Sequence, residues 1–257
     1  MRRQYFEDKF IVPFAPLSEE EGIAQGYTII KTAEDFESLG DMYGDIINLK
    51  ILLINDIDIR ENHRNLYLRD SEMNGNGHTI YTKRNVFKYL TYDTLTSLVK
   101  NLKVVMDTDV SQCSVAEHCM NSTIDNCIID SKFCHSGVLG GVVYVCEPNS
   151  IISNCIVRCH QINNEGRNTG GIVFHSINST ISNCNVEFKI DTILAPLKVG
   201  IICVDCQSSV ITNCHGILYK NGELKRSDSF NSWLSPIYAI SGSSINQVSA
   251  QFKIIKL

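Results

Sequence analysis

The sequence lacks features that mark several large classes of protein. No stretch of the 257 residues is apolar over the roughly 18 positions that a membrane-spanning helix needs. The 23 basic and 28 acidic side chains give a formal net charge of only -5, too small an imbalance for a phosphate-binding surface or an acidic mimic of nucleic acid. We therefore expect no membrane insertion and no nucleic-acid partner.

The amino terminus lacks the pattern of a secretory signal, because Arg2 and Arg3 are followed by acidic residues and by no long apolar run. The 11 cysteines are an odd number in a long chain, and four of them recur at one position of a repeat. These features favour reduced, buried thiols over a disulfide framework. They predict a protein made in the cytoplasm, with signal-less export or association with a virion left open.

A repeat is the main feature that the sequence does have. The dipeptide Asn-Cys occurs at intervals of 28, 29 and 30 residues, beginning at Asn126, Asn154, Asn183 and Asn213. Such intervals are typical of a solenoid, in which each short unit buries its apolar face only by stacking on the next. Leu102 occupies the cysteine position of an earlier unit, so this position requires an apolar side chain and not thiol chemistry.

Each unit carries the signals of β-strands and no helical period. In residues 171–190, runs rich in β-branched and aromatic residues are bounded by Asn, Ser and Gly. Cys184, Val186 and Phe188 alternate with polar residues and should face a core. The predicted fold is all-β: a parallel β-helix solenoid with three short strands per coil, in which equivalent residues stack about 4.8 Å apart.

The repeated asparagines should form columns at the corners of this solenoid. Asparagine tolerates the left-handed backbone of a tight corner, and its amide can bond to the amides above and below it. A second column lies five residues earlier and marks the preceding corner. Its members are Asn121, Asn149, Asn178 and Ser208.

Two phrases of the repeat resemble those of a known family. Gly-Gly-Ile-Val at residues 170–173 and Ser-Thr-Ile-Ser-Asn-Cys at residues 179–184 are similar to the Gly-rich repeats of GLUG-type bacterial surface proteins and, more broadly, to the pectate-lyase-like superfamily. The resemblance covers residues 45–222 and implies a right-handed parallel β-helix. It implies no single activity, because that superfamily includes lyases, hydrolases, tailspikes, adhesins and binding scaffolds. The family's Gly-Leu-x-Gly phrase is altered at residues 137–141, and its usual export signal is missing.

We expect three regions along the chain. Residues 1–44 should form an arm and a capping helix with Thr32 as its N-cap, since an open stack of strands needs covered ends. Residues 45–222 should form the β-helix. Residues 223–257, where the repeat is no longer recognisable, should form a C-terminal cap.

A row of metal-binding residue types precedes the first corner on successive coils: His118, Cys146, His175 and Asp205. Such a row could bind zinc, or supply a base and a nucleophile. Steps of about 4.8 Å, however, place its ends too far apart for one ion with bonds of about 2.0 to 2.3 Å. We therefore predict an ordinary solvated corner, with no metal and no other cofactor.

Charged side chains suggest an enzymatic alternative. Asp130, Arg158 and Glu187 fall at nearly equivalent positions on successive coils, and Asp125 lies close by in the sequence. Acids on the flank of a β-helix can act as acid and base in a polysaccharide lyase or hydrolase. A ladder of alternating charge that only decorates the surface explains the same pattern. The sequence leaves catalysis uncertain and favours a protein that is not an enzyme.

Three hypotheses for the function follow. The favoured one is a non-enzymatic β-helix that presents a rigid flank and loops to a protein partner or a glycan, because the repeat is regular and no catalytic set converges. The alternatives are a carbohydrate-active enzyme and a phage or pathogen inhibitor or effector that acts on a cytosolic host protein. A homodimer or homotrimer is compatible with each. The polar loop at residues 160–169 is the expected contact region, with Asn163, Asn164, Glu165, Arg167 and Asn168 as its candidate binding residues.

Overall fold

A computed structural model provides the fold of the chain. It describes residues 9–61, 64–106, 115–131, 134–135, 139–164, 169–193, 199–221 and 234–255.

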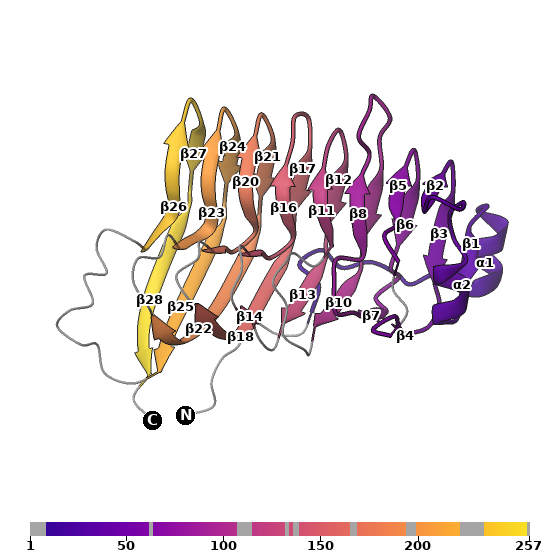
Figure 1. Cartoon of the computed structure of the whole chain (residues 1–257), viewed down its shortest axis with the longest axis horizontal. Coiled ribbons are helices and arrows are strands. Elements are labelled where there is room, and N and C mark those ends of the chain that lie inside the picture. Colours follow the sequence, from indigo (N-terminus) through magenta and orange to yellow (C-terminus); the bar gives the residue numbers. More distant parts are fainter. Residues whose placement is uncertain are drawn as a thin grey trace.

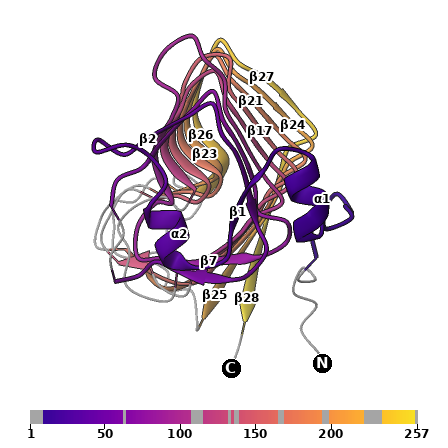
Figure 2. The ribbon, with the colours of Figure 1, turned by 90° about the vertical axis from the view of Figure 1, so that its right-hand side faces the viewer.

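Three parallel sheets, here named A, B and C, enclose one apolar interior along the described part of the chain (Figures 1 and 2). Sheet A contains β1 (Thr28–Ile30), β3 (Lys50–Leu53), β6 (Glu72–Asn74), β9 (Leu98–Lys100), β12 (Thr123–Asp125), β17 (Ile151–Ser153), β21 (Thr180–Ser182), β24 (Val210–Thr212) and β27 (Ser244–Asn246). Sheet B contains β2 (Asp45–Ile47), β5 (Tyr67–Arg69), β8 (Phe87–Leu90), β11 (Ala116–Cys119), β15 (Leu139–Gly140), β16 (Val143–Cys146), β19 (Thr169–Gly170), β20 (Val173–Ile177), β23 (Val199–Gln207) and β26 (Leu234–Ser241). Sheet C contains β4 (Ile57–Asp58), β7 (Thr79–Tyr81), β10 (Lys103–Met106), β13 (Ile128–Ser131), β14 (Cys134–His135), β18 (Ile156–Asn164), β22 (Asn185–Ile193), β25 (His215–Asn221) and β28 (Ser249–Ile255). The predicted parallel β-helix is confirmed.

Equivalent residues of successive coils lie directly opposite one another. In sheet A, for example, Ile152 is paired with Ile124 on one side and with Ile181 on the other. The cysteines of the repeat follow the same rule and are fully buried: Cys127, Cys155, Cys184 and Cys214. All nine cysteines whose side chains the structure describes are free thiols in the interior, as the sequence predicted.

The corners of the solenoid contain the predicted asparagine columns. At the A–C corner, where each coil passes from sheet A to sheet C, Asn126, Asn154, Asn183 and Asn213 have φ values between 50° and 55°. The Nδ2 atom of Asn213 donates to Oδ1 of Asn183 over 2.7 Å, which is the amide ladder expected of such a column. At the B–A corner, where each coil passes from sheet B to sheet A, the equivalent left-handed residues are Asn121, Asn149, Asn178 and Ser208.

Two short helices lie at the amino-terminal end of the solenoid (Figure 2). The predicted capping helix is α2 (Ala33–Glu37), and Thr32 exchanges capping hydrogen bonds with Asp35 as expected. Its Phe36 is fully buried and its ring centroid lies 6.2 Å from that of Phe87. The sequence analysis missed a second helix, α1 (Glu19–Ala24), although Ser18 and Glu21 form the same kind of capping box.

The strands extend beyond the boundaries expected from the sequence. At the carboxyl end, β26, β27 and β28 pair in parallel with β23, β24 and β25, so described residues 234–255 add a coil where a separate C-terminal cap at residues 223–257 was expected. Gln247 and Val248 take the places of Asn213 and Cys214 in this coil, and this replacement hid the repeat. At the other end, β1 already joins sheet A within residues 1–44.

None of the described residues forms a helix that is long and apolar enough to cross a membrane.

The cysteine column should tolerate apolar replacement and reject charge. Burial, together with the neighbouring thiol of Cys127, raises the pKa of Cys155 well above its ordinary value, so this side chain behaves as a neutral, apolar group. We expect Cys155→Val to change the free energy of unfolding by less than about 1.5 kcal/mol and Cys155→Asp to lower it by more than about 3 kcal/mol. Urea denaturation followed by circular dichroism measures both. Equal losses in the two variants would show that the thiol itself is required.

Candidate functional site

The B–A corner is interrupted on one coil. Between β8 and β9 the chain inserts a loop, residues 91–97, that extends beyond the turns of the neighbouring coils (Figure 1); we call it the corner loop. Thr91 has the left-handed backbone of the corner position, and its hydroxyl lies 3.1 Å from that of Ser97 at the base of the loop. Nδ2 of Asn121 donates to the backbone oxygen of Asp93 over 2.7 Å. The amide ladder of this corner is therefore diverted into the loop.

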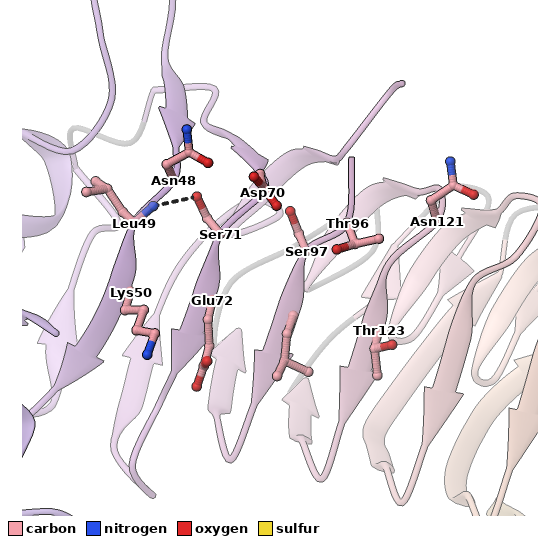
Figure 3. A pocket seen from close by; sticks show the side chains of 11 residues that line it. Asn48, Leu49, Lys50, Asp70, Ser71, Glu72, Thr96, Ser97, Asn121 and Thr123 are labelled. Atoms are coloured by element: carbon pink, nitrogen blue, oxygen red, sulfur yellow. Dashed lines mark hydrogen bonds between the residues drawn. The ribbon is translucent and has the colours of Figure 1, made fainter. Parts of the chain in front are cut away.

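A groove of about 530 Å³ opens beside the corner loop, on its sheet A side. Figure 3 shows Lys50, Glu72 and Thr123 projecting from β3, β6 and β12 of sheet A, and Asn48, Asp70 and Asn121 placed along the corner. We call this feature the corner groove. Its lining residues are Asn48, Leu49, Lys50, Asp70, Ser71, Glu72, Thr96, Ser97, Leu98, Asn121 and Thr123.

Several groups in the corner groove have unused hydrogen-bonding capacity. Asn48 and Asp70 occupy corner positions with φ of 55° and 45°, yet neither side chain joins a ladder. Within the described residues, the side chains of Asn48, Asp70, Thr96 and Thr123 make no hydrogen bond to protein. The Lys50 ammonium lies 5.7 Å from the ring centroid of Tyr27. The groove thus offers a carboxylate, an amide, hydroxyls and a cation to a ligand.

Glu72 forms a fixed anionic centre at the edge of this set. Its Oε1 accepts a hydrogen bond from the Tyr27 hydroxyl over 2.5 Å and lies 2.7 Å from Nζ of Lys100. Burial by itself would raise the pKa of Glu72, but the bonds from Lys100 and Tyr27 outweigh it and lower the pKa. Burial and the bond to Glu72 raise the pKa of Tyr27 to about 12. Both groups therefore keep a single protonation state near neutral pH.

An aromatic cluster supports the corner loop from its sheet B side. The rings of Tyr67, Tyr89 and His118 stack on successive strands, with centroid distances of 5.8 and 4.6 Å. Tyr92 from the loop packs edge-on against both tyrosines, and the Arg69 guanidinium lies 4.5 Å from its ring centroid. Because each stacked ring covers a face of the next ring, the cluster mainly supports the corner loop. It holds the wall of the corner groove in place.

The predicted metal row is only partly correct. His118, His175 and Asp205 do share one outward column of sheet B, but Val145 takes the fourth place. Cys146 lies in the adjacent inward column and is fully buried. The corner between Cys146 and Ile151 is one residue longer than the corners between Cys119 and Thr123 and between Ser176 and Thr180. A shift of one residue turns a side chain to the opposite face of a strand.

The members of this outward column do not form a metal centre. His118 places Nδ1 2.7 Å from Oε1 of Glu147, and His175 places Nδ1 3.4 Å from Oδ2 of Asp205. Among the residues that the structure describes, no three His, Cys, Asp or Glu side chains are arranged to hold a metal ion.

The four acid and base candidates do not share a site. Asp130, Arg158 and Glu187 are direct neighbours on β13, β18 and β22, as their spacing predicted. Arg158 and Glu187 are each only 6% exposed, so at these positions the ladder is not the surface decoration that the sequence suggested. Asp125 lies on sheet A, where its Oδ1 accepts from Oγ of Ser153 over 2.6 Å and from Nδ2 of Asn154 over 2.7 Å. Its carboxylate is thereby used to fix the A–C corner.

The predicted contact loop stays a prediction. Asn163 and Asn164 lie at the end of β18, and their side chains are outside those described. Glu165, Arg167 and Asn168 lie outside the described residues.

Sequence reasoning missed the corner groove entirely. Apart from Asn121 and Thr123, its residues belong to the early coils, where the Asn-Cys phrase is absent. These coils are shorter: Asp45 pairs with Tyr67, and Tyr67 with Tyr89, at intervals of 22 residues. The extra residues between Leu90 and Leu98 were the available signal, but only the register of the neighbouring coils shows that they interrupt a corner.

Comparisons with known proteins give only a weak structural likeness. No family model matches the chain, and no curated protein sequence matches it either. The crystal structure of a putative immunoglobulin A1 protease from Bacteroides ovatus is similar, with a TM-score of 0.46 and 13% sequence identity; the match covers 95% of this chain and 80% of that chain. At this level of similarity it carries no argument about function.

Removal of Glu187 should reduce stability. Its carboxylate is buried next to Arg158, and its removal leaves the buried Arg158 charge with Asp130 as its remaining acidic neighbour across the strands. We expect Glu187→Ala to lower the free energy of unfolding by about 3 kcal/mol. The control, Asp205→Ala, removes a half-exposed carboxylate near His175 and should cost less than about 1 kcal/mol. Comparable small losses in both variants would show that Glu187 has no structural role.

The titration of Tyr27 tests the arrangement at the edge of the groove. Glu72→Gln removes the charged acceptor, so the pKa of Tyr27 should fall from about 12 towards the ordinary value of about 10. It should remain above that value because burial is unchanged. The difference in phenolate absorbance against a Tyr27→Phe background, followed with pH, measures the shift. Titration at about 12 in the variant as well would contradict the contact.

Proposed function

We propose that this protein is a non-enzymatic β-helix that binds a glycan in the corner groove. The observation that carries the proposal is the set of unused hydrogen-bonding groups, from Asn48, Asp70, Thr96 and Thr123, where the corner ladder is interrupted. Several amides elsewhere in the corner columns bond to one another, as Asn149 does to Asn121 and Asn213 to Asn183. Here they are free to bond to a ligand.

The lining suits a ligand rich in hydroxyl groups. Carboxylates and amides accept and donate the paired hydrogen bonds that sugar hydroxyls offer, and hydrogen bonds to a charged group such as Asp70 are the strongest of these. Leu49 and Leu98 are the apolar members of the lining. Pockets for drug-like small molecules are instead lined mostly by apolar and aromatic side chains. The volume of about 530 Å³ fits a short segment of a chain of sugars.

The groove is also built to bind without large rearrangement. Its floor is a set of paired strands, and its wall is the corner loop, which the Tyr67, Tyr89 and Tyr92 rings brace from behind. A preorganised site loses less conformational entropy on binding. A surface protein of the GLUG type, which the repeat phrases resemble, would use such a rigid flank as a binding scaffold.

Variants at the corner test this proposal. The full-length chain is screened on a glycan array, and the affinity for the best ligand is then measured by calorimetry. We expect Asp70→Asn, which keeps the shape but removes the charge, to weaken binding by about tenfold or more. Asn48→Gly should also weaken it, while preserving the left-handed backbone. Asn178→Gly is the matched control at the same corner outside the groove, and it should bind like the wild type.

Two outcomes would overturn the proposal. One is equal affinity in Asp70→Asn, Asn48→Gly and Asn178→Gly, which would place any glycan elsewhere. The other is turnover of a polysaccharide, tested on a panel of polyuronides, because this would make the protein the carbohydrate-active enzyme of the alternative hypothesis. In that case Asp130→Ala and Glu187→Ala would show whether the sheet C ladder takes part.

A further inference from the structure

The A–C corner already holds a peptide, which is the chain's own amino-terminal segment. The described residues 9–17, here called the arm, follow the coils at this corner as the indigo segment in Figure 1. Asn126 accepts from the backbone N–H of Val12 over 2.9 Å and donates to the backbone oxygen of the same residue over 2.8 Å. Asn76 makes the same pair of bonds with Leu17, over 2.8 and 3.0 Å.

Each of these asparagine side chains binds the arm as a neighbouring β-strand would. An amide offers one donor and one acceptor side by side, which match the N–H and C=O of a single residue in an extended segment. The recognition is of backbone and not of side chains. Proline disfavours helical backbone in the arm, since Val12 precedes Pro13, and residues 13–17 follow the bend at Ile11 and Val12 without regular secondary structure. A segment of this kind loses little entropy when it docks.

Peptide binding does not disrupt the ladder. While Asn126 holds Val12, its Nδ2 also donates to Oδ1 of Asn101 over 2.8 Å. One proton of the amide thus serves the ladder, and the other serves the peptide. Phe14 adds a side-chain contact, because its ring lies over Gly77, where a Cβ would come within 3.3 Å of it.

The other end of the same corner carries the same groups uncovered. Under the arm, Asn76 and Asn126 are 4% and 1% exposed. Asn183, Asn213 and Gln247 are exposed, although their φ values of 54°, 50° and 51° match those of Asn76 and Asn126, at 55° and 53°. Two coils separate Asn183 from Gln247, as two coils separate Asn76 from Asn126. Nothing in the described part of the chain occupies these amides from the side on which the arm lies.

We propose that the exposed stretch of the A–C corner, at Asn183, Asn213 and Gln247, binds an extended peptide of another protein by the backbone pairing that Asn76 and Asn126 make with the arm. The partner is a proline-containing segment without regular secondary structure, recognised mainly through its N–H and C=O groups. This site lies at a different corner from the corner groove and is independent of glycan binding.

A synthetic peptide with the sequence of residues 9–18 is the probe, because this sequence is complementary to the corner. Labelled peptide is titrated with the full-length protein, and binding is followed by fluorescence anisotropy. We expect saturable binding that Asn183→Gly combined with Gln247→Gly weakens by at least about tenfold. Glycine removes the side chain but keeps the left-handed backbone. The matched control, Asn149→Gly combined with Ser208→Gly, makes the same change two coils apart at the B–A corner and should bind as the wild type does.

A second probe separates backbone recognition from side-chain contact. A peptide that is N-methylated at the positions of Val12 and Leu17 keeps every side chain and loses both donors, so it should bind at least about tenfold more weakly. Absence of binding by the unmodified peptide, or equal binding by both peptides, would overturn the proposal. So would binding that survives the Asn183 and Gln247 substitutions and is lost in Asn76→Gly with Asn126→Gly, since the probe would then only replace the chain's own arm.

Discussion

Parallel pairing in register is the constraint on which the rest of this structure depends. Each strand has its equivalent one coil away as its neighbour, so every position of the repeat becomes a column with steps of about 4.8 Å. A column inside is either apolar, as the cysteines at residues 127, 155, 184 and 214 are, or hydrogen-bonded throughout, as the buried serines at residues 122, 150 and 179 are. A column at a corner must tolerate left-handed backbone, as the asparagines do. The column to which a residue belongs therefore limits the side chains that it can carry.

The same constraint explains why function should lie at the corners. The amides of a corner column satisfy one another when the column is regular, as in the bond between Asn149 and Asn121. Where a loop interrupts the column, Asn48 and Asp70 are left with hydrogen-bonding capacity. At the A–C corner one amide can serve both the column and a peptide, since Asn126 donates to Asn101 and to the arm at the same time. An interrupted corner suits a compact polar ligand, and a complete one suits an extended chain.

Stacking also gives rigidity to the faces between the corners. The Tyr67, Tyr89 and His118 rings lie on one another because their strands are one coil apart. Their faces are used in this contact, so the aromatic flank supports the corner loop and leaves few ring faces for a sugar to stack on. On sheet C, the buried Arg158 and Glu187 are likewise direct neighbours because their strands are one coil apart.

The sequence by itself determined the architecture, because interval, β-branched runs and corner asparagines all report local backbone preferences that the chain carries with it. The columns of Asn183 and Cys184, the capping helix at Thr32 and the buried thiols could all be predicted in this way. Only the tertiary structure decided the sites. One extra residue in the corner between Cys146 and Ile151 places Cys146 in the core and Val145 in the outward column. The insertion after Leu90 acquires meaning only beside the neighbouring coils, and the arm meets Asn126 across 114 positions of sequence. Contacts of this range depend on the exact number of residues in every coil between them, and no local pattern records that number.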